Sequence, residues 1–301
     1  MLQDSRPDNA TLLMVAGQTK ETNMKYVRFG KKGDEKPGIL DASGRVRDLS
    51  VIINDLSGDV LSYLPVLNNI DVDSLPLVEE GCRLGSPIAG TGKFICVGLN
   101  YADHAAESGM AVPSEPVLFM KATSAICGPN DPIIIPKKSS KTDWEVELAV
   151  IIGKPAKYVS ESNALDHIAG YAVTNDVSER EFQIERQGQW TKGKSCDNFG
   201  QIGPWLVTPD EISDPQDLRL WLTVNGKTYQ NGSTRTMVYG VAYLISYISQ
   251  FMTLEQGDVI STGTPPGVGL GQTPPQFLKP GDIVELGIDG LGQQRQETIL
   301  D

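Results

Sequence analysis

Short apolar runs separated by turn residues dominate the chain from Lys93 to its end. Each run is only a few residues long and is bounded by glycine, proline, asparagine or aspartate. Runs of this length and spacing are typical of the strands of a β-rich domain. The runs are FICVGL (94–99), PIIIP (132–136), VELAVIIG (146–153), GYAVTND (170–176), LRLWLTVNG (218–226), DVISTG (258–263) and DIVELGI (282–288).

Two stretches have apolar spacing that suits a helix better than a strand. They are SEREFQIERQ (178–187) and VAYLISYISQFM (241–252). Because the strands do not alternate regularly with helices, neither a Rossmann fold nor a TIM barrel is expected. The pattern predicts an α+β fold that is rich in β-structure.

The N-terminal part of the chain has a different pattern. Residues 1–23 are polar and aperiodic, which indicates a disordered or vector-derived tail. From Met24 to about Leu84, the short strands KYVRF and PGILD flank a glycine-containing turn, and a polar helix-prone stretch follows. We therefore predict a tail at 1–23, a small α+β module at 24–92 and a β-rich main domain at 93–301.

The composition is that of a soluble globular protein. Hydrophobic residues make up 40% and charged residues 21% of the 301 residues, which is close to the average for such proteins. The longest apolar run, 148–152, has five residues, whereas a membrane-spanning helix needs roughly 20. Because the first thirty residues also lack a signal-peptide core, we expect a cytoplasmic protein.

The net charge and the cysteine spacing exclude several classes of binding partner and of site. The formal net charge of -12 argues against nucleic acid and anionic membranes as binding partners. The cysteines lie at wide, irregular spacings without a C-x-x-C motif, which argues against a zinc site and against a secreted disulfide framework. We expect reduced thiols at Cys82, Cys96, Cys127 and Cys196.

The segment DWEVELAVIIG holds the most informative pair of residues. In a strand, Glu145 and Glu147 share one face with α-carbons roughly 6.6 Å apart. One interpretation is a solvated strand face, the usual pattern of an exposed sheet. However, Ala149 and Ile151 continue the same face as apolar residues, which predicts that this face becomes buried. Two buried carboxylates require a cation or their protons.

Further charged residues follow downstream. Asp176 ends the run GYAVTND, and Lys192 and Lys194 lie in the glycine-containing segment TKGKSCDNFG. Asp176 taken alone is also typical of an ordinary turn or helix-entry residue. Three carboxylates around an oxygen-coordinated ion would suit Mg²⁺ or Mn²⁺ and leave positions for water and substrate oxygens.

The segment GLNYADHAAESGM suggests a general base. His104 and Glu107 are three residues apart, so in a helix they share a face and the carboxylate can orient the imidazole. A surface histidine beside a convenient glutamate is the alternative. The chain has only two histidines, and Gly98, Asn100 and Gly109 punctuate this segment as in a mobile loop. The other histidine, His167, is expected to pack or to cap.

A third segment, ISTGTPPGVGLG, is a glycine-rich loop after a strand. It lacks the Gly-Lys-Ser/Thr ending of a phosphate cradle, and Pro265 and Pro266 remove two amide donors. The hydroxyl of Thr264, beside Gly263, would be suited to receive a carboxylate. A purely structural turn is the default alternative.

Together these segments resemble the fumarylacetoacetate hydrolase family over nearly all of residues 93–290. The resemblance lies in the order of the pieces, because no single piece is specific. That order is GLNYADHAAE, FMKATSAI, DWEVELAVIIG, GYAVTNDVSEREFQ, KGKSCDNFGQIGPW and ISTGTPPGVG.

The resemblance implies a fold, an assembly and a site. The fold is a mixed β-sandwich or β-roll catalytic domain with a small N-terminal module, usually as a homodimer. The metal ligands correspond to Glu145, Glu147 and Asp176, which hold Mg²⁺ or Mn²⁺. The implied catalytic residues are His104 and Glu107, on a loop that becomes a lid helix, and Lys194 beside the metal. The implied substrate-binding residues are Lys121, Arg180, Gln183 and Thr264.

These roles lead to a hypothesis about the reaction. The metal orients a 2,4-dioxo acid through its 1-carboxylate and 2-oxo oxygen. His104, held by Glu107, takes a proton from water, and the resulting hydroxide attacks the C4 carbonyl. The C3–C4 bond then breaks, the metal and Lys194 stabilise the developing pyruvate enolate, and pyruvate and a second acid leave.

In detail, the sequence is most similar to bacterial hydrolases of 2,4-dioxo-3-deoxy-L-rhamnonate or L-fuconate, which yield pyruvate and L-lactate. The segments that carry this similarity are KYVRFGKKGDEKPGILD, SEREFQIERQGQWTKGKSCDNFG and STRTMVYGV. Similar chains are often named ureidoglycolate lyases, so that activity is an alternative. Acylpyruvate hydrolase and oxaloacetate decarboxylase activities are further alternatives within the family. A non-catalytic binding protein that keeps the fold is an alternative from another class.

Overall fold

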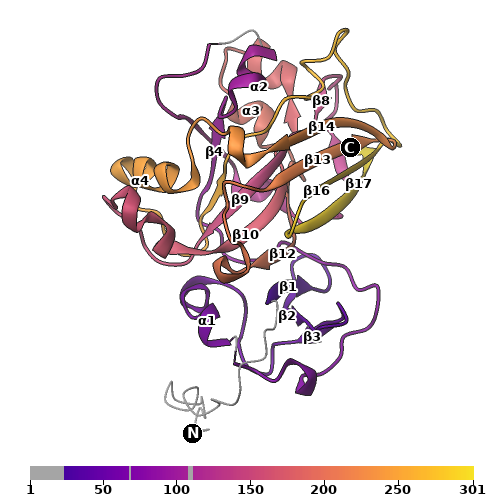
Figure 1. Ribbon diagram of the computed structural model, residues 1–301. Coiled ribbons are helices and arrows are strands. Elements are labelled where there is room, and N and C mark those ends of the chain that lie inside the picture. Colours follow the sequence, from indigo (N-terminus) through magenta and orange to yellow (C-terminus); the bar gives the residue numbers. More distant parts are fainter. Residues whose placement is uncertain (1–23, 68, 108–110) are drawn as a thin grey trace, which may run out of the picture.

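The computed structural model describes the backbone of residues 24–67, 69–107 and 111–301 (Figure 1). The side chains of residues 104–106 are outside this description. The tail expected at residues 1–23 also lies outside the described residues. Among the helices of the described segments, none is both long and apolar enough to cross a membrane.

A ten-stranded mixed sheet forms the larger layer. Its strand order is β3-β2-β1-β12-β10-β9-β15-β4-β5, and β6 pairs with β12 off this path. Most neighbours are antiparallel, whereas β15–β4 and β12–β6 are parallel. The strands are β1 (Lys25–Phe29), β2 (Lys36–Leu40), β3 (Val46–Asp48), β4 (Phe94–Gly98), β5 (Val117–Lys121), β6 (Ile126–Cys127), β9 (Val146–Ile152), β10 (Ile168–Asn175), β12 (Gly200–Val207) and β15 (Val259–Ser261).

A five-stranded sheet packs against the larger one, and a two-stranded sheet lies near the site. The order in the former is β14-β13-β16-β17-β7, and β13, β16 and β17 contact β9, β10 and β12 of the larger sheet (Figure 1). The strands are β7 (Ile133–Ile135), β13 (Arg219–Val224), β14 (Lys227–Ser233), β16 (Ile283–Ile288) and β17 (Gly292–Leu300), with β8 (Thr142–Asp143) and β11 (Ser178–Glu179) forming the small sheet.

Helices are short and connect the strands. The α-helices are α1 (Leu64–Leu67), α2 (Ala102–Glu107), α3 (Thr191–Lys194) and α4 (Val241–Phe251). A π-helix covers Glu181–Glu185. The 3-10 helices are Gly58–Ser62, Val72–Ser74, Thr123–Ala125, Glu161–His167, Pro209–Glu211 and Thr234–Thr236.

Strand β9 is buried on both faces and separates two hydrophobic cores. Val146 and Leu148 face the core between the two sheets, which also contains side chains of β13 and β16. Ala149 and Ile151 face the second core, which includes side chains of the N-terminal segment. Glu147 alternates with the first set and therefore points to the same side as Ala149. The predicted burial of the glutamate face is confirmed.

The N-terminal strands extend the main sheet. Strand β1 pairs antiparallel with β12, and β2 and β3 follow outward to the edge of the sheet. Apolar side chains of this segment, such as Tyr26 and Ile39, are completely buried in the second core. The boundary expected at residue 92 stays a prediction, since the hydrogen-bonded sheet runs through both parts.

The β-rich α+β fold predicted from the apolar runs is confirmed, because each of the seven runs quoted above contains a strand. The helix expected at 241–252 is present as α4. The helix expected at 178–187 is confirmed only over Glu181–Glu185, as a π-helix. Its first two residues form β11 against β8, and only a five-residue π-helix follows. Glu179 accepts hydrogen bonds from Ser139 and Thr142 on the β8 side, and these tertiary contacts override the local helical spacing.

Candidate active site

Three carboxylates meet where β9 and β10 lie side by side. Glu145 immediately precedes β9 and Glu147 lies within it, while Asp176 follows the last residue of β10. The Asp176 N–H donates to the Glu145 carbonyl at 2.9 Å, so the strand pairing itself brings these residues together. One oxygen of each carboxylate lies within 4.8 Å of the others, and the three residues are at most 5% exposed.

Two of these carboxylates are bound by buried cations. The Lys194 ammonium donates to Glu145 at 2.8 Å and to Asp176 at 2.7 Å. Lys121 donates to the other Asp176 oxygen and, at 3.0 Å, to the Val177 carbonyl. Burial opposes the charge of Lys194, but Asp176 and Glu145 outweigh it and raise the pKa of this lysine. Lys194 is therefore a charged partner of the carboxylates.

Glu147 has a different environment. Its Oε2 accepts hydrogen bonds from the Ser261 hydroxyl at 2.5 Å and from the Gly263 N–H at 2.8 Å. Among the described side chains, no ammonium or guanidinium group lies within ion-pair distance of it. Burial, together with the charges of Asp176 and Glu145, raises the pKa of Glu147 well above its usual range. The site therefore contains a buried carboxylate that lacks a cationic partner.

The donor set fits a hard divalent ion. All three candidate ligands offer carboxylate oxygens, which is the chemistry that Mg²⁺ and Mn²⁺ prefer. A buried, uncompensated carboxylate such as Glu147 is costly unless a cation or a proton neutralises it. Within the described part of the chain, no second cluster of this kind was found. Glu145, Glu147 and Asp176 are the residues that could hold a metal.

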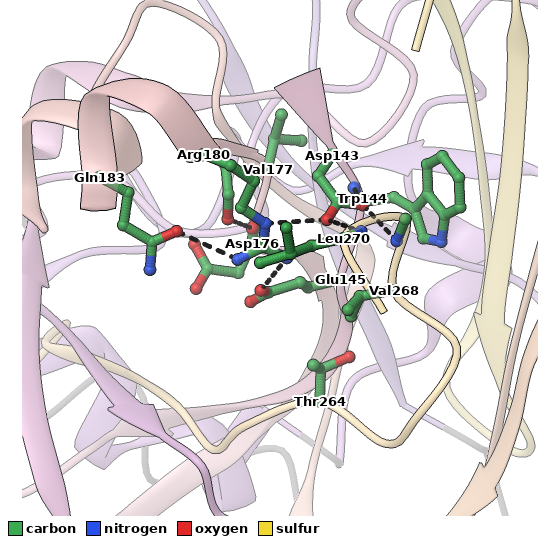
Figure 2. Close-up of polar contacts among 12 residues, drawn as sticks. Asp143, Trp144, Glu145, Asp176, Val177, Arg180, Gln183, Thr264, Val268 and Leu270 are labelled. Carbon is green, nitrogen blue, oxygen red and sulfur yellow. Dashed lines mark hydrogen bonds and ion pairs between the residues drawn. The ribbon is translucent and has the colours of Figure 1, made fainter. Parts of the chain in front are cut away.

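Arg180 connects this cluster to a fourth carboxylate, Asp143 (Figure 2). Its Nε donates to Asp143 at 2.8 Å, its Nη2 lies 2.7 Å from Glu145, and its Nη1 donates to the Gln183 side chain at 3.1 Å. Asp143 is fully buried. The sequence interpretation missed this residue, although the alternation Asp143, Glu145, Glu147 would have been a usable signal.

The glycine-rich loop after β15 donates main-chain N–H groups to three carboxylates. Besides the bond from Gly263 to Glu147, the N–H of Gly269 donates to Asp143 at 2.6 Å and that of Leu270 at 2.9 Å. Gly267 donates to Glu107 at 2.9 Å. Gly267 has a φ of +109°, and a Cβ there would lie 1.9 Å from the Tyr229 carbonyl oxygen, so only glycine fits.

Thr264 lies in the same loop and lines the cavity. Its hydroxyl donates to the Val146 carbonyl at 2.9 Å and accepts a hydrogen bond from Gln230 at 2.8 Å. The hydroxyl proton is thus directed toward β9 in this structure. The substrate-binding role of Thr264 stays a prediction.

The proposed acid–base pair lies on the short helix α2. Residues 102–107 are helical, and Tyr101 and Asn100 anchor the start of the helix. The Glu107 carboxylate contacts the Gly267 N–H, which places this end of α2 against the glycine-rich loop. The side chain of His104 lies outside the described residues, so the pairing of His104 with Glu107 stays a prediction.

The structure separates the two lysines of the segment TKGKS. Lys194 is buried in the carboxylate cluster, whereas the Lys192 ammonium donates to the Arg186 carbonyl at the surface. His167 ends a 3-10 helix, and its Nδ1 lies 3.3 Å from the Lys154 carbonyl oxygen. Of the predicted site residues, those brought together around the three carboxylates are Lys121, Arg180, Gln183 and Lys194.

A cavity of about 100 Å³ opens onto the cluster. Its polar side is formed by Glu145, Glu147, Arg180, Gln183, Lys194 and Thr264. Its other lining residues are apolar and include Phe119 and Trp190, which the sequence interpretation did not single out. The cavity therefore combines a charged end with an apolar wall, as expected of a small-molecule site.

Comparisons with known proteins agree with this architecture. The family model of the fumarylacetoacetate (FAA) hydrolase C-terminal region matches residues 93–299. A protein of Burkholderia multivorans that is named only as a hydrolase is 64% identical over 278 residues, which cover 91% of this chain and 99% of that protein.

Two solved structures are similar over nearly their whole length. Fumarylacetoacetate hydrolase from Exiguobacterium antarcticum is 38% identical, with a TM-score of 0.81 over 92% of this chain and 100% of that chain. Maleylpyruvate hydrolase from Sphingobium sp. SYK-6, in complex with manganese(II) ion and pyruvate, is 26% identical, with a TM-score of 0.76 over 92% of this chain and 99% of that chain.

Proposed function

This chain belongs to the fumarylacetoacetate hydrolase family, and from that premise we propose that it is a divalent-metal-dependent hydrolase of a small 2,4-dioxo acid. The reaction cleaves the C3–C4 bond with water and yields pyruvate and a second carboxylic acid. The observation that carries the proposal is the buried cluster of Glu145, Glu147 and Asp176 at the end of a cavity. The similar maleylpyruvate hydrolase, with its manganese ion and pyruvate, supports the same chemistry.

The three carboxylates would hold Mg²⁺ or Mn²⁺. When bound, such an ion supplies Lewis acidity and polarises an oxo group of the substrate. Arg180 and Gln183, already hydrogen-bonded to each other, present donors to the substrate carboxylate from the wall of the cavity. Lys194, kept charged by its carboxylate neighbours, stabilises negative charge that develops on the departing enolate.

Helix α2 supplies the proton transfer in this proposal. His104 accepts a proton from water, and the hydroxide attacks the C4 carbonyl. Glu107, whose carboxylate contacts the glycine-rich loop at Gly267, positions the end of α2 beside the cavity. Breaking the C3–C4 bond leaves the electron pair on C3, which takes up a proton to give the methyl group of pyruvate.

The proposed substrates are the 2,4-dioxo-3-deoxy derivatives of L-rhamnonate or L-fuconate, which would give pyruvate and L-lactate. This choice is based on the sequence similarity of three segments to such hydrolases, namely KYVRFGKKGDEKPGILD, SEREFQIERQGQWTKGKSCDNFG and STRTMVYGV. Ureidoglycolate cleavage is the second candidate from the same likeness.

The test measures pyruvate release from the rhamnonate or fuconate derivative, with acetylpyruvate, oxaloacetate and ureidoglycolate alongside. Each reaction is run with EDTA and after Mg²⁺ or Mn²⁺ is added back. Pyruvate and lactate that disappear with EDTA and return with metal are the expected result. Urea and glyoxylate from ureidoglycolate, without pyruvate from any dioxo acid, would contradict the proposed substrate class.

A thermal-stability measurement separates an enzyme from a binding protein that has lost its metal site. A ligand that binds only the folded state raises the melting temperature. We expect Mg²⁺ or Mn²⁺ to raise it in the wild-type protein but not in the Asp176→Asn variant. An equal shift in both proteins would show that the ion binds elsewhere.

A further inference from the structure

Two aromatic side chains form one wall of the cavity beside the charged cluster. The rings of Phe119, on β5, and Trp190, just before α3, meet edge to face with centroids 5.2 Å apart. Both residues line the cavity. The Lys194 ammonium lies 5.0 Å from the centre of the Phe119 ring, so the aromatic pair adjoins the cluster that receives the charged end of a substrate.

The position of Trp190 depends on a glycine at the end of β4. A Cβ built on Gly98 would lie 2.7 Å from Cζ3 and 3.1 Å from Cη2 of the indole, which is closer than real side chains approach. Glycine at this position therefore lets the indole lie against the strand. The atoms that face Gly98 belong to the carbon ring of the indole, on the side away from Nε1.

The remaining lining residues with apolar side chains offer no hydrogen-bonding group. They are Val97, Leu99, Ile184, Val268 and Leu270. The polar side chains among the described lining residues all belong to the charged end of the cavity or to the loop at Thr264. Apart from the indole N–H of Trp190, the aromatic and aliphatic side chains offer a hydroxyl group no partner, so a hydroxyl placed against them would lose its water at a cost in free energy.

We propose that Phe119 and Trp190, whose indole lies against Gly98, form an apolar subsite that receives the terminal alkyl group of the acyl chain and determines specificity. The inference rests on the proposed cleavage of a 2,4-dioxo acid and goes beyond it by naming the chemistry at the far end of the substrate. Chains that end in a methyl group are accepted, and chains that end in a hydroxymethyl group are disfavoured.

The size of the expected effect follows from the nature of the wall. An apolar pocket rejects an added hydroxyl group by up to roughly a hundredfold, whereas a site built to bind a hydroxyl rejects the analogue lacking it by 10⁴-fold or more. We therefore expect kcat/KM to fall about 10- to 100-fold when the terminal methyl becomes hydroxymethyl. Removing the hydroxyl at C5 should change kcat/KM by less than about tenfold, because that group precedes the terminal carbon and is not the group placed against the wall.

The first experiment uses the wild-type protein loaded with Mg²⁺ and three substrates of equal chain length. They are 2,4-dioxohexanoate, its 5-hydroxy derivative and its 5,6-dihydroxy derivative, and pyruvate release gives kcat/KM for each. The inference is supported if the two methyl-ended acids are similar and the hydroxymethyl-ended acid is slower. Equal or faster turnover of the hydroxymethyl acid overturns it. If none of the three gives pyruvate, the proposed function itself fails.

Two variants assign the preference to the aromatic wall. Trp190→Gln places an amide where the indole lies, and Gly98→Ala displaces the indole by the close contact of its Cβ. Each should reduce the methyl-to-hydroxymethyl ratio of kcat/KM by about tenfold. The control is Tyr158→Gln, because Tyr158 is 68% exposed and lies outside the cavity. An unchanged ratio in both wall variants, with soluble folded protein, would refute the role of the wall.

Discussion

Two clusters of charged residues in this molecule are built alike but differ in burial. The junction cluster, between the N-terminal strands and the main sheet, consists of Arg28, Glu35, Asp55, Arg83 and Asp131, whose side chains are 10–30% exposed. The site cluster consists of Lys121, Asp143, Glu145, Glu147, Asp176, Arg180 and Lys194, whose ion-paired side chains are at most 7% exposed.

The larger of the two cavities does not lie at the site cluster. A cavity of about 450 Å³ lies at the junction cluster, whereas the cavity at the site cluster is about 100 Å³. At the junction, the carboxylates of Glu35, Asp55 and Asp131 are each paired with an arginine. At the site, Glu147 is buried, and no ammonium or guanidinium group of the described side chains lies within ion-pair distance of it. An unbalanced buried charge is therefore the better marker of chemistry here than an empty volume.

The largest effect is expected from the carboxylates of the site cluster. Asp176→Asn and Glu147→Gln should each reduce kcat by at least about a thousandfold, because each removes a ligand of the Lewis-acidic ion. Their effects on stability should differ. Asp176→Asn leaves Lys121 and Lys194 undercompensated and should lower the free energy of unfolding by about 3 kcal/mol. Glu147→Gln removes a buried carboxylate that has no ion-pair partner, so the free energy of unfolding should stay equal or rise.

Urea unfolding of the apo-proteins measures this contrast. The amide of Glu147→Gln can still accept the hydrogen bonds of Ser261 and Gly263, so a loss of several kcal/mol in this variant would show that its carboxylate stabilises the fold. Equal losses in both variants would mean that the difference in pairing between Glu147 and Asp176 has no energetic consequence.

A smaller effect should follow from the two aspartates that hold arginines in the same way. Asp143 and Asp131 each bind a guanidinium and main-chain N–H groups. Asp143→Asn should lower kcat/KM about 10- to 100-fold, mainly through KM, because Arg180 loses its anchor. Asp131→Asn is the matched control at the junction and should leave steady-state kinetics unchanged. An intact KM in Asp143→Asn would remove Asp143 from the site.

At the junction cluster, Glu35→Gln should lower the free energy of unfolding by about 1 kcal/mol near neutral pH and leave the kinetics unchanged. Although burial raises the pKa of Glu35, hydrogen bonds from Arg83 and from main-chain N–H groups outweigh it and hold the pKa below the ordinary 4.5. A lowered pKa in the folded state stabilises the protein above the unfolded-state pKa, and this contribution is lost as pH falls through the folded-state pKa.

The difference in unfolding free energy between wild type and Glu35→Gln should thus be constant from pH 6 to 8, by the same linkage, and shrink below about pH 4.5. Urea unfolding at a series of pH values measures this difference. The control is Asp34→Asn, because Asp34 is the exposed residue next to Glu35. A difference that grows as the pH falls would contradict the assigned direction of the pKa shift.

The smallest effect is expected where both partners are exposed. Lys137 and Asp301 lie 3.7 Å apart with side chains 77% and 56% exposed. Lys137→Ala should change neither kcat nor, by more than about 0.5 kcal/mol, the free energy of unfolding. A larger loss of stability would show that burial is not what separates the clusters.

The sequence predicted those parts of the site that depend on local alternation. The period of two in Glu145 and Glu147, followed by the apolar Ala149 and Ile151, was enough to predict a buried carboxylate pair. Likewise, the apolar runs predicted the strands, because each run spans most of one strand. These features depend only on residues that are neighbours along the chain.

The sequence did not predict contacts between distant segments. Asp143 shares the local alternation of the two glutamates, but its partners, the N–H groups of Gly269 and Leu270, lie more than a hundred residues away and could not be predicted. Spacing could not distinguish Lys192 from Lys194, since only the fold brings Lys194 to the buried carboxylates of Glu145 and Asp176. Trp190 belongs to no periodic pattern in the sequence. Its position depends on the space that Gly98 leaves at the end of β4.

The glycine-rich loop has a consequence for how this enzyme can be dissected and how its sequence can change. The loop binds Glu147, Glu107 and Asp143 through main-chain N–H groups, so changing a side chain of the loop does not by itself delete any of these donors. Replacing a single amide by an ester, at Gly269 for example, would delete one donor and leave every side chain intact. For the same reason another apolar side chain can replace that of Leu270 while its N–H group keeps its partner.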